Sequence, residues 1–203
     1  STETAKKVIS DSSTSIKKYS MELGGNAPFI VFDDADLDNA INIGAAIKFG
    51  NCGQICVAAN RFFVHEKVYD KFLNGLIEKA KNLKIGYSED LDFEIGPLIS
   101  KKSRDRITNL IKDTIDSGGN LEYGGGIPEM NGNWFEPTVI SGINESMSIF
   151  HEEIFGPVAS IIKFKYDDEV LNQANKTQYG LASYLFTKDK KRIDKFVDEL
   201  DFG

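Results

Sequence analysis

Cysteine, histidine and long apolar runs are scarce in this 203-residue sequence, and each scarcity excludes a class of protein. Two cysteines are too few for the disulfide framework of a small secreted domain, so we expect a reducing, cytoplasmic setting. Two histidines, His65 and His151, stand far apart and predict no metal site. No run of 18 apolar residues occurs, so the sequence predicts no contact with a membrane interior.

Positive charge is also in short supply. Lys and Arg total 24 against 31 Asp and Glu, which gives a net charge of −7. Proteins that bind nucleic acid present basic surfaces to the phosphate backbone, so we expect no nucleic-acid partner. Hydrophobic residues make up 41% of the chain, enough for a core and too many for intrinsic disorder.

Strand-like and helix-like segments alternate along most of the chain. Short apolar runs predict strands, and apolar residues at helical spacing predict the helices between them. The expected strands cover 27–32, 61–65, 134–140, 158–166 and 181–187, with a short strand between 119 and 124. The expected helices cover 1–11, 37–47, 68–83, 101–117, 167–175 and 188–200, and 15–22 is expected to be extended. Strands separated by helices predict an α/β fold, a three-layer sandwich with a largely parallel sheet.

Cys56 is the first candidate for chemistry. It follows Gly53-Gln54-Ile55 in a loop directly after an expected helix. A thiolate exposed on such a loop is a strong nucleophile toward a carbonyl carbon, and backbone N–H groups there can stabilise an oxyanion. A free cysteine is more often a small buried residue, and composition alone leaves that alternative open.

Two acidic motifs are further candidates. Glu22 stands between Met21 and Leu23, where partial desolvation would raise its pKa toward the range of a general base. The alternative is a glutamate at a sheet edge that faces water. Residues 152–157 (EEIFGP) combine carboxylates, an aromatic ring and a Gly-Pro turn. A carboxylate can accept both hydroxyls of a ribose and a phenyl ring can pack on a nicotinamide, although an ordinary solvated loop is the alternative.

Three motifs, in their order and spacing, resemble those of the aldehyde dehydrogenase superfamily. They are residues 21–26 (MELGGN), 53–56 (GQIC) and 152–157 (EEIFGP). Segments 95–99, 135–138 and 175–181 also resemble family segments, so the resemblance covers essentially the whole chain. It implies a catalytic-domain fragment of a longer enzyme, with 1–25 as the end of the dinucleotide-binding domain and 26–203 as the catalytic domain.

The resemblance also implies a reaction, the oxidation of an aldehyde to its carboxylic acid with NAD or NADP. Cys56 would attack the aldehyde, and Glu22 would activate the water that hydrolyses the resulting thioester. The residues implied to contact the cofactor are Ser1, Leu23, Glu153 and Phe155, with Glu153 on the nicotinamide ribose and Phe155 beside the ring. The family further implies a homo-oligomer.

Segments 26–36 and 56–61 look most like the succinate-semialdehyde dehydrogenase branch. That branch usually has an arginine six residues before the nucleophile, where this chain has Gly50. An arginine there would pair with the distal carboxylate of the substrate, and glycine cannot, so the identity of the aldehyde stays open.

Two alternative hypotheses assign the chain a function of a different class from that of a dehydrogenase. The first is a catalytically silent folding or assembly module, because most of the family's cofactor-binding domain has no counterpart in the chain and hydride transfer needs a positioned cofactor. The second is a cysteine hydrolase, which would want a histidine near Cys56, and nothing in the sequence argues that His65 or His151 lies there.

Overall fold

A six-stranded sheet organises the computed structural model, which describes residues 2–87 and 92–203. The strands are β1 (Ala27–Val31), β2 (Ala59–His65), β3 (Asn120–Tyr123), β4 (Thr138–Ser141), β5 (Val158–Phe164) and β6 (Tyr184–Phe186). Their order across the sheet is β3-β4-β5-β2-β1-β6, and every neighbouring pair is parallel except β3 with β4. The predicted α/β fold with a largely parallel sheet is therefore confirmed.

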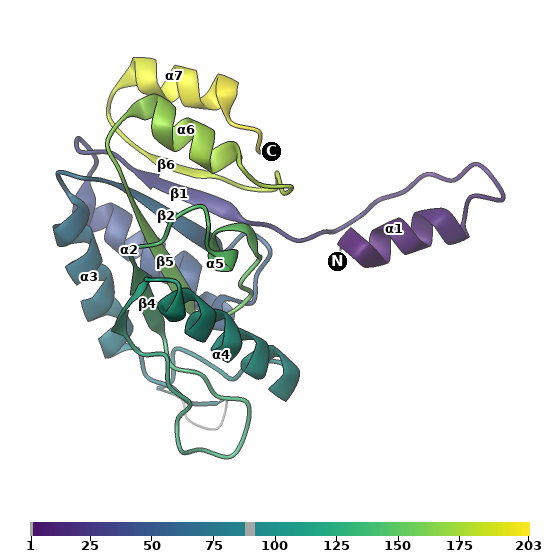
Figure 1. Cartoon of the computed structure of the whole chain (residues 1–203), viewed down its shortest axis with the longest axis horizontal. Coiled ribbons are helices and arrows are strands. Elements are labelled where there is room, and N and C mark those ends of the chain that lie inside the picture. Colours follow the sequence, from purple (N-terminus) through teal and green to yellow (C-terminus); the bar gives the residue numbers. More distant parts are fainter. Residues whose placement is uncertain (1, 88–91) are drawn as a thin grey trace.

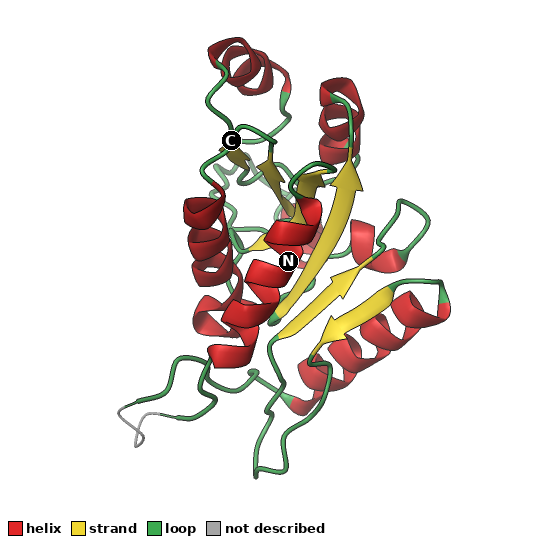
Figure 2. Cartoon of the chain, turned by 90° about the vertical axis from the view of Figure 1, so that its left-hand side faces the viewer, coloured by secondary structure: helices red, strands yellow, loops and turns green. Residues whose placement is uncertain are grey.

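Helices cover both faces of this sheet (Figures 1 and 2). They are α2 (Leu37–Phe49), α3 (Tyr69–Asn82), α4 (Lys101–Asp116), α5 (Ser148–His151), α6 (Asp167–Asn175) and α7 (Lys190–Glu199), with a 3₁₀ turn η1 (Gly50–Gly53). A further helix, α1 (Thr2–Asp11), does not pack on the sheet in Figure 1. Alternate residues of β1 point to opposite faces: Phe29 and Val31 pack with α2 and α3, whereas Ile30 and Phe32 pack in the core with α4 to α7. Burial on both faces explains why the strands read as continuous apolar runs.

The chain departs from the sequence-based expectation in several places. The expected strand 134–140 begins only at Thr138, because Pro137 has no N–H to donate and the N–H of Glu136 bonds to Gly126 in a loop. The short helix α5 was not expected. The expected strand 181–187 is shorter, since β6 covers only Tyr184–Phe186. Residues 15–22, expected to be extended, form neither helix nor strand and link α1, which lies apart from the sheet in Figure 1, to β1. The assignment of 1–25 to a separate domain stays a prediction.

No helix in the two described ranges is long and apolar enough to cross a membrane.

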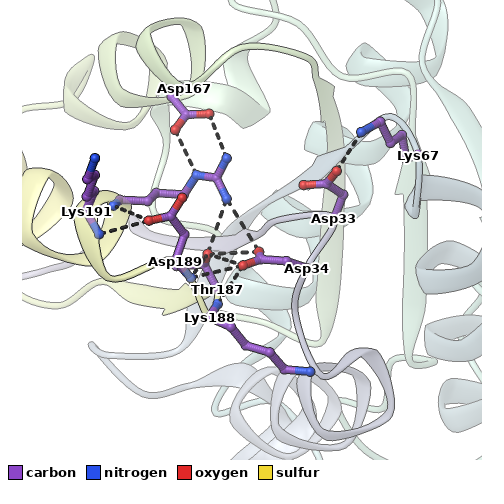
Figure 3. A network of polar contacts seen from close by, with 9 residues as sticks. Asp33, Asp34, Lys67, Asp167, Thr187, Lys188, Asp189 and Lys191 are labelled. Atoms are coloured by element: carbon purple, nitrogen blue, oxygen red, sulfur yellow. Dashed lines mark hydrogen bonds and ion pairs between the residues drawn. The ribbon is translucent and has the colours of Figure 1, made fainter.

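Asp34, which follows β1, ties the carboxyl end of that strand to the turn between β6 and α7 (Figure 3). Its carboxylate accepts hydrogen bonds from the Thr187 hydroxyl at 2.8 and 2.9 Å. It also accepts two backbone N–H groups, those of Lys188 at 2.8 Å and Asp189 at 3.0 Å. One carboxylate thus satisfies the first donors of the turn that leads into α7.

Arg192 on α7 extends this network to α6. Its guanidinium donates to Asp34 at 3.4 Å and forms two hydrogen bonds with Asp167, at 2.7 and 3.3 Å. The same guanidinium lies 4.0 Å from the centroid of the Phe32 ring, a cation–π contact. Burial alone would raise the pKa of Asp34, but the hydrogen bonds it accepts and the charge of Arg192 outweigh burial and hold that pKa below its ordinary value.

We expect Asp34→Ala to lower the free energy of unfolding by about 2 kcal/mol, because it leaves the partly buried donors of the β6–α7 turn without an acceptor. Asp33→Ala is the matched control: the neighbouring carboxylate makes one ion pair with the exposed Lys67, at 2.7 Å, and its loss should cost less than about 1 kcal/mol. Urea unfolding of both variants measures the difference, and equal losses would contradict the assignment.

Candidate active site

Four loops meet at one edge of the sheet, the edge formed by the amino ends of the parallel strands. Residues 21–26 lead into β1, η1 and the loop after it lead into β2, 152–157 lead into β5, and 178–183 lead into β6. Because β5, β2, β1 and β6 are neighbours and run in one direction, their amino ends lie side by side. The three motifs singled out in the sequence therefore come together in space.

Backbone contacts join these motifs directly. A Cβ at Gly25 would lie 2.1 Å from the carbonyl oxygen of Cys56, so no side chain fits there. The N–H of Gly25 donates to Oε1 of Glu153 at 2.9 Å. Gly53 has φ +68°, which favours glycine, and a Cβ on it would lie 2.1 Å from the carbonyl oxygen of Gly156. Each of the three motifs thus touches the other two.

Buried polar side chains of two asparagines and an arginine hold these loops by hydrogen bonds. The Asn60 side-chain amide donates to Oδ1 of Asn26 at 2.9 Å and to the carbonyl of Glu152 at 2.8 Å. Asn26 donates in turn to the carbonyl of Phe150 at 3.0 Å, and the guanidinium of Arg61 donates twice to the carbonyl of Asn26. Sequence reasoning missed these residues. The available signal was polar side chains at the start of two otherwise apolar strands.

The two cysteines have different surroundings. Cys52 is 1% exposed and belongs to the hydrophobic core, and burial raises the pKa of its thiol to about 12. Cys56 is partly exposed and lies in the loop between η1 and β2. At neutral pH Cys52 is therefore a protonated core residue, and Cys56 is the more exposed of the two cysteines.

Lys48, at the end of α2, is completely buried beneath the site. Its ammonium donates to Oδ1 of Asn60 at 3.4 Å. Burial lowers the pKa of Lys48 to about 7, and the negative charge of the Glu153 carboxylate acts in the opposite direction. Its position inside the apolar spacing of α2 gave no sign of this burial, because a lysine there is expected to face water.

Glu22 and Leu23 are both exposed, with Leu23 38% accessible. They line a cavity of about 320 Å³ together with Thr2, Met21, Gly24 and residues 178–181. Within residues 2–87 and 92–203 the Glu22 carboxylate has no hydrogen-bond or ion-pair partner. The expected partial desolvation of Glu22 is not observed, because Leu23 beside it is exposed and Met21 is only partly buried. The backbone of Gly25 packs against the carbonyl of Cys56, but no described contact joins the side chains of Glu22 and Cys56.

Phe155, in the loop that leads into β5, lines a different cavity from Glu22. It is 37% exposed and has φ +49°. It lines a cavity of about 570 Å³ with Asn51, Gln54 and residues 97–99. Gln54 fastens the two loops of this cavity together, since it accepts the N–H of Ile99 at 2.8 Å and donates to the carbonyl of Pro97 at 3.3 Å. Ser1, the remaining predicted cofactor residue, lies outside the described residues.

Tyr184 is a further residue near the site that sequence reasoning missed. It begins β6, and its hydroxyl donates to the carbonyl of Val57 at 2.7 Å. Burial raises the pKa of Tyr184, and negative charge at Cys56 raises it further. Tyr184 therefore holds the residue that follows Cys56. In the part of the chain that the structure describes, no three His, Cys, Asp or Glu side chains gather as a metal site.

Comparison with known proteins finds the same family that the sequence motifs resemble. The aldehyde dehydrogenase family matches residues 1–203. Succinate-semialdehyde dehydrogenase (NADP(+)) 2 of Schizosaccharomyces pombe is 43% identical over 100% of this chain and 41% of that protein. Succinate-semialdehyde dehydrogenase (NADP(+)) GabD of Escherichia coli is 41% identical over 100% of this chain and 42% of that protein. The crystal structure of succinate-semialdehyde dehydrogenase from Burkholderia pseudomallei superimposes with a TM-score of 0.98 at 40% identity, covering 100% of this chain and 42% of that one. The chain spans about two fifths of the length of these relatives.

The pH dependence of stability reports on Lys48. An unfolded lysine holds its proton up to about pH 10.5, whereas folded Lys48 holds it only below about pH 7. Between these values the unfolded state binds more protons, so the free energy of unfolding contributed by Lys48 rises with pH. We therefore expect the stability of Lys48→Met relative to the native sequence to be highest near pH 6 to 7 and to fall by about 1.4 kcal/mol per pH unit toward pH 9.

Urea unfolding at several pH values measures this difference. Lys71→Met, at an exposed position of α3, removes the same charge and should leave the difference constant with pH. A constant difference for Lys48→Met as well would show that its ammonium does not titrate in this range.

Proposed function

The chain belongs to the aldehyde dehydrogenase family, and from this premise we propose that it is the catalytic part of an enzyme that oxidises an aldehyde to its carboxylic acid with NAD or NADP. The observation that carries the proposal is the contact among the three motifs. Gly25 touches the carbonyl of Cys56 and donates to Glu153, so the nucleophile loop lies against both carboxylate-bearing segments. Because the chain spans about two fifths of its relatives' length, the proposal concerns the whole protein.

In the proposed reaction the Cys56 thiolate adds to the aldehyde carbon, and the backbone N–H of Cys56 donates to the oxyanion of the thiohemiacetal. A bound nicotinamide cofactor would supply the oxidant: the thiohemiacetal on Cys56 would lose a hydride to it and become a thioester. Glu22 then takes a proton from the water that attacks the thioester, which releases the acid and the free thiolate. The partial exposure of Cys56 supports its role, and the exposed carboxylate of Glu22, which has no partner in the described part of the chain, supports the role of a base.

The residues at the site fit a nicotinamide ribose. Glu153 offers a carboxylate with a second oxygen beside the one that Gly25 occupies, and Phe155 offers an exposed flat ring on a cavity of about 570 Å³. We propose that Glu153 binds the ribose hydroxyls, Phe155 packs beside the ring and Leu23 lies nearby, with Ser1 as a further contact. The names of the two relatives specify NADP(+), which favours NADP for this chain.

A second candidate follows from the length of the chain. Since 203 residues cover only 41–42% of the relatives, the chain by itself is proposed to be a folding or assembly module that binds cofactor too weakly for turnover. The family resemblance implies that the whole enzyme is a homo-oligomer.

Two substitutions test the reaction in the full product of the reading frame that encodes this chain, hereafter the full product. Cys56→Ala should abolish both aldehyde oxidation and cofactor-independent ester hydrolysis, because both need the thiolate. Glu22→Gln should leave a rapid burst of reduced cofactor and slow steady turnover by about 10²–10⁴-fold, since only hydrolysis of the thioester needs the base. Stopped-flow absorbance of the reduced nicotinamide measures both phases.

Cys52→Ala is the matched control, because it removes a core thiol and should keep both activities. Normal aldehyde oxidation by Cys56→Ala would refute the proposed function. The same assays on residues 1–203 alone decide the second candidate: aldehyde-dependent reduction of NAD(P) by the isolated chain would contradict it.

Gly50 is the proposed determinant of substrate choice. It begins η1, and apart from the neighbouring backbone no described atom lies within 4 Å of the position that a Cβ would take. We expect Gly50→Arg to raise kcat/KM for succinate semialdehyde relative to an uncharged aldehyde of equal length by about tenfold or more, because a charge-assisted hydrogen bond contributes about 1.5–3 kcal/mol. Gly50→Met fills the same space without charge and should not show this gain. An unchanged preference in Gly50→Arg would place the distal end of the substrate elsewhere.

A further inference from the structure

Phe155 has a backbone conformation that its own side chain disfavours. Its φ of +49° lies in the left-handed region, which bulky residues adopt only where the surrounding structure enforces it. The neighbouring residues on both sides are fixed: Ile154 is completely buried, and Gly156 sits so close to α4 that a Cβ on it would lie 2.3 Å from Cδ1 of Ile107. The turn that carries Glu153 and Phe155 is therefore held against α4.

Arg106 makes the polar contacts between α4 and this turn. It precedes Ile107 on α4, and its guanidinium donates to the carbonyl of Ile154, the group that immediately precedes Phe155. It also donates to the carbonyl of Glu153 at 3.4 Å, and Nη1 lies 3.7 Å from Oε2 of Glu152. Fixing the carbonyl of Ile154 fixes the plane of the peptide that joins it to Phe155, and this plane limits the φ of Phe155.

Arg106 and Phe155 line different cavities. Arg106 lines a cleft of about 630 Å³ together with Ser148, Glu152 and neighbouring residues of α4. It does not line the cavity of Phe155, whose lining comes from residues 51, 54 and 97–99. The described contacts of Arg106 with the turn are thus to backbone carbonyls and to the side chain of Glu152, and not to the exposed face of the Phe155 ring.

We propose that Arg106 is a positioning residue, which holds the turn 153–156 in the conformation that presents Glu153 and Phe155 to the nicotinamide half of the cofactor. The inference rests on the proposed function, because it concerns how that cofactor is bound. Arg106 acts through the turn and has no described contact with Cys56, so its loss should affect the steps that need cofactor more than the reactivity of Cys56.

The experiment compares two activities of the full product. The first is aldehyde oxidation, from which the KM for NADP is obtained at saturating aldehyde. The second is hydrolysis of a nitrophenyl ester without cofactor, which reports on Cys56 alone. In Arg106→Met we expect the KM for NADP to rise about tenfold, equivalent to about 1.4 kcal/mol, while ester hydrolysis stays within about twofold. Arg106→Lys keeps the charge but loses the planar fork, and we expect an intermediate KM.

Arg104→Met is the matched control. Arg104 also lies on α4 and also donates to a backbone carbonyl, that of Gly132 at 3.0 Å, which is outside the turn. Its loss should leave the KM for NADP unchanged. A similar rise in both variants would show a general effect of α4 and overturn the inference, as would an unchanged KM in Arg106→Met or a parallel loss of both activities.

Two further measurements keep the outcomes separate. If Arg106→Met does not fold, Arg106→Gln and Arg106→Lys decide the same comparison, and an unchanged KM in both overturns the inference. If the unsubstituted full product oxidises no aldehyde, the proposed function fails. In that case calorimetric titration of NADP into the unsubstituted protein and into Arg106→Met tests the role of Arg106 alone, and equal affinities overturn it.

Discussion

Parallel pairing of β5, β2, β1 and β6 is the constraint on which the site depends. It brings the loops before these strands to one edge, whatever their separation in the chain. Parallel α/β sheets commonly bind ligands at the carboxyl ends of their strands. Here the candidate chemistry lies at the amino ends, and part of the opposite edge is used for structure: Asp34 and Arg192 join β1, β6, α6 and α7 there. The amino ends of these strands thus carry the candidate site, and the carboxyl ends of β1 and β6 carry a structural network.

Close backbone approach is the second requirement, and it explains why glycines stand within the motifs. Gly25 packs on the carbonyl of Cys56, and Gly53 packs on that of Gly156, at distances that exclude a side chain. These contacts set the spacing between the loops more tightly than side-chain packing would. The glycines near Glu22 and Cys56 therefore allow the loops to pack closely, and the proposed chemistry is assigned to other residues of the same motifs.

The sequence predicted much of the fold because its strands are buried on both faces. The bounds predicted for the strands 27–32 and 158–166 agree with those of β1 and β5 within two residues. The predicted strand 134–140 begins too early, because the effect of Pro137 depends on which strand lies beside it. The site was less predictable. Nothing in the spacing of Cys52 and Cys56 shows that one enters the core and the other faces solvent, and the burial of Lys48 depends on contacts with residues distant in sequence. The roles proposed for Cys56, Glu22 and Glu153 came from the family resemblance and not from composition.

The buried polar layer shows how such a site can be rigid and still reactive. Asn26, Asn60 and Arg61 direct their hydrogen bonds to backbone carbonyls and to one another, so they fix loops without occupying the groups proposed to react. Replacing a buried polar network with apolar residues often costs little stability, but it removes the directional bonds that select one arrangement. Among the residues that the structure describes, Glu22 has no side-chain partner, and Cys56 is partly exposed, because other residues hold their segments in place. Separating the residues that position from those that react is what preorganisation requires of a site built on loops.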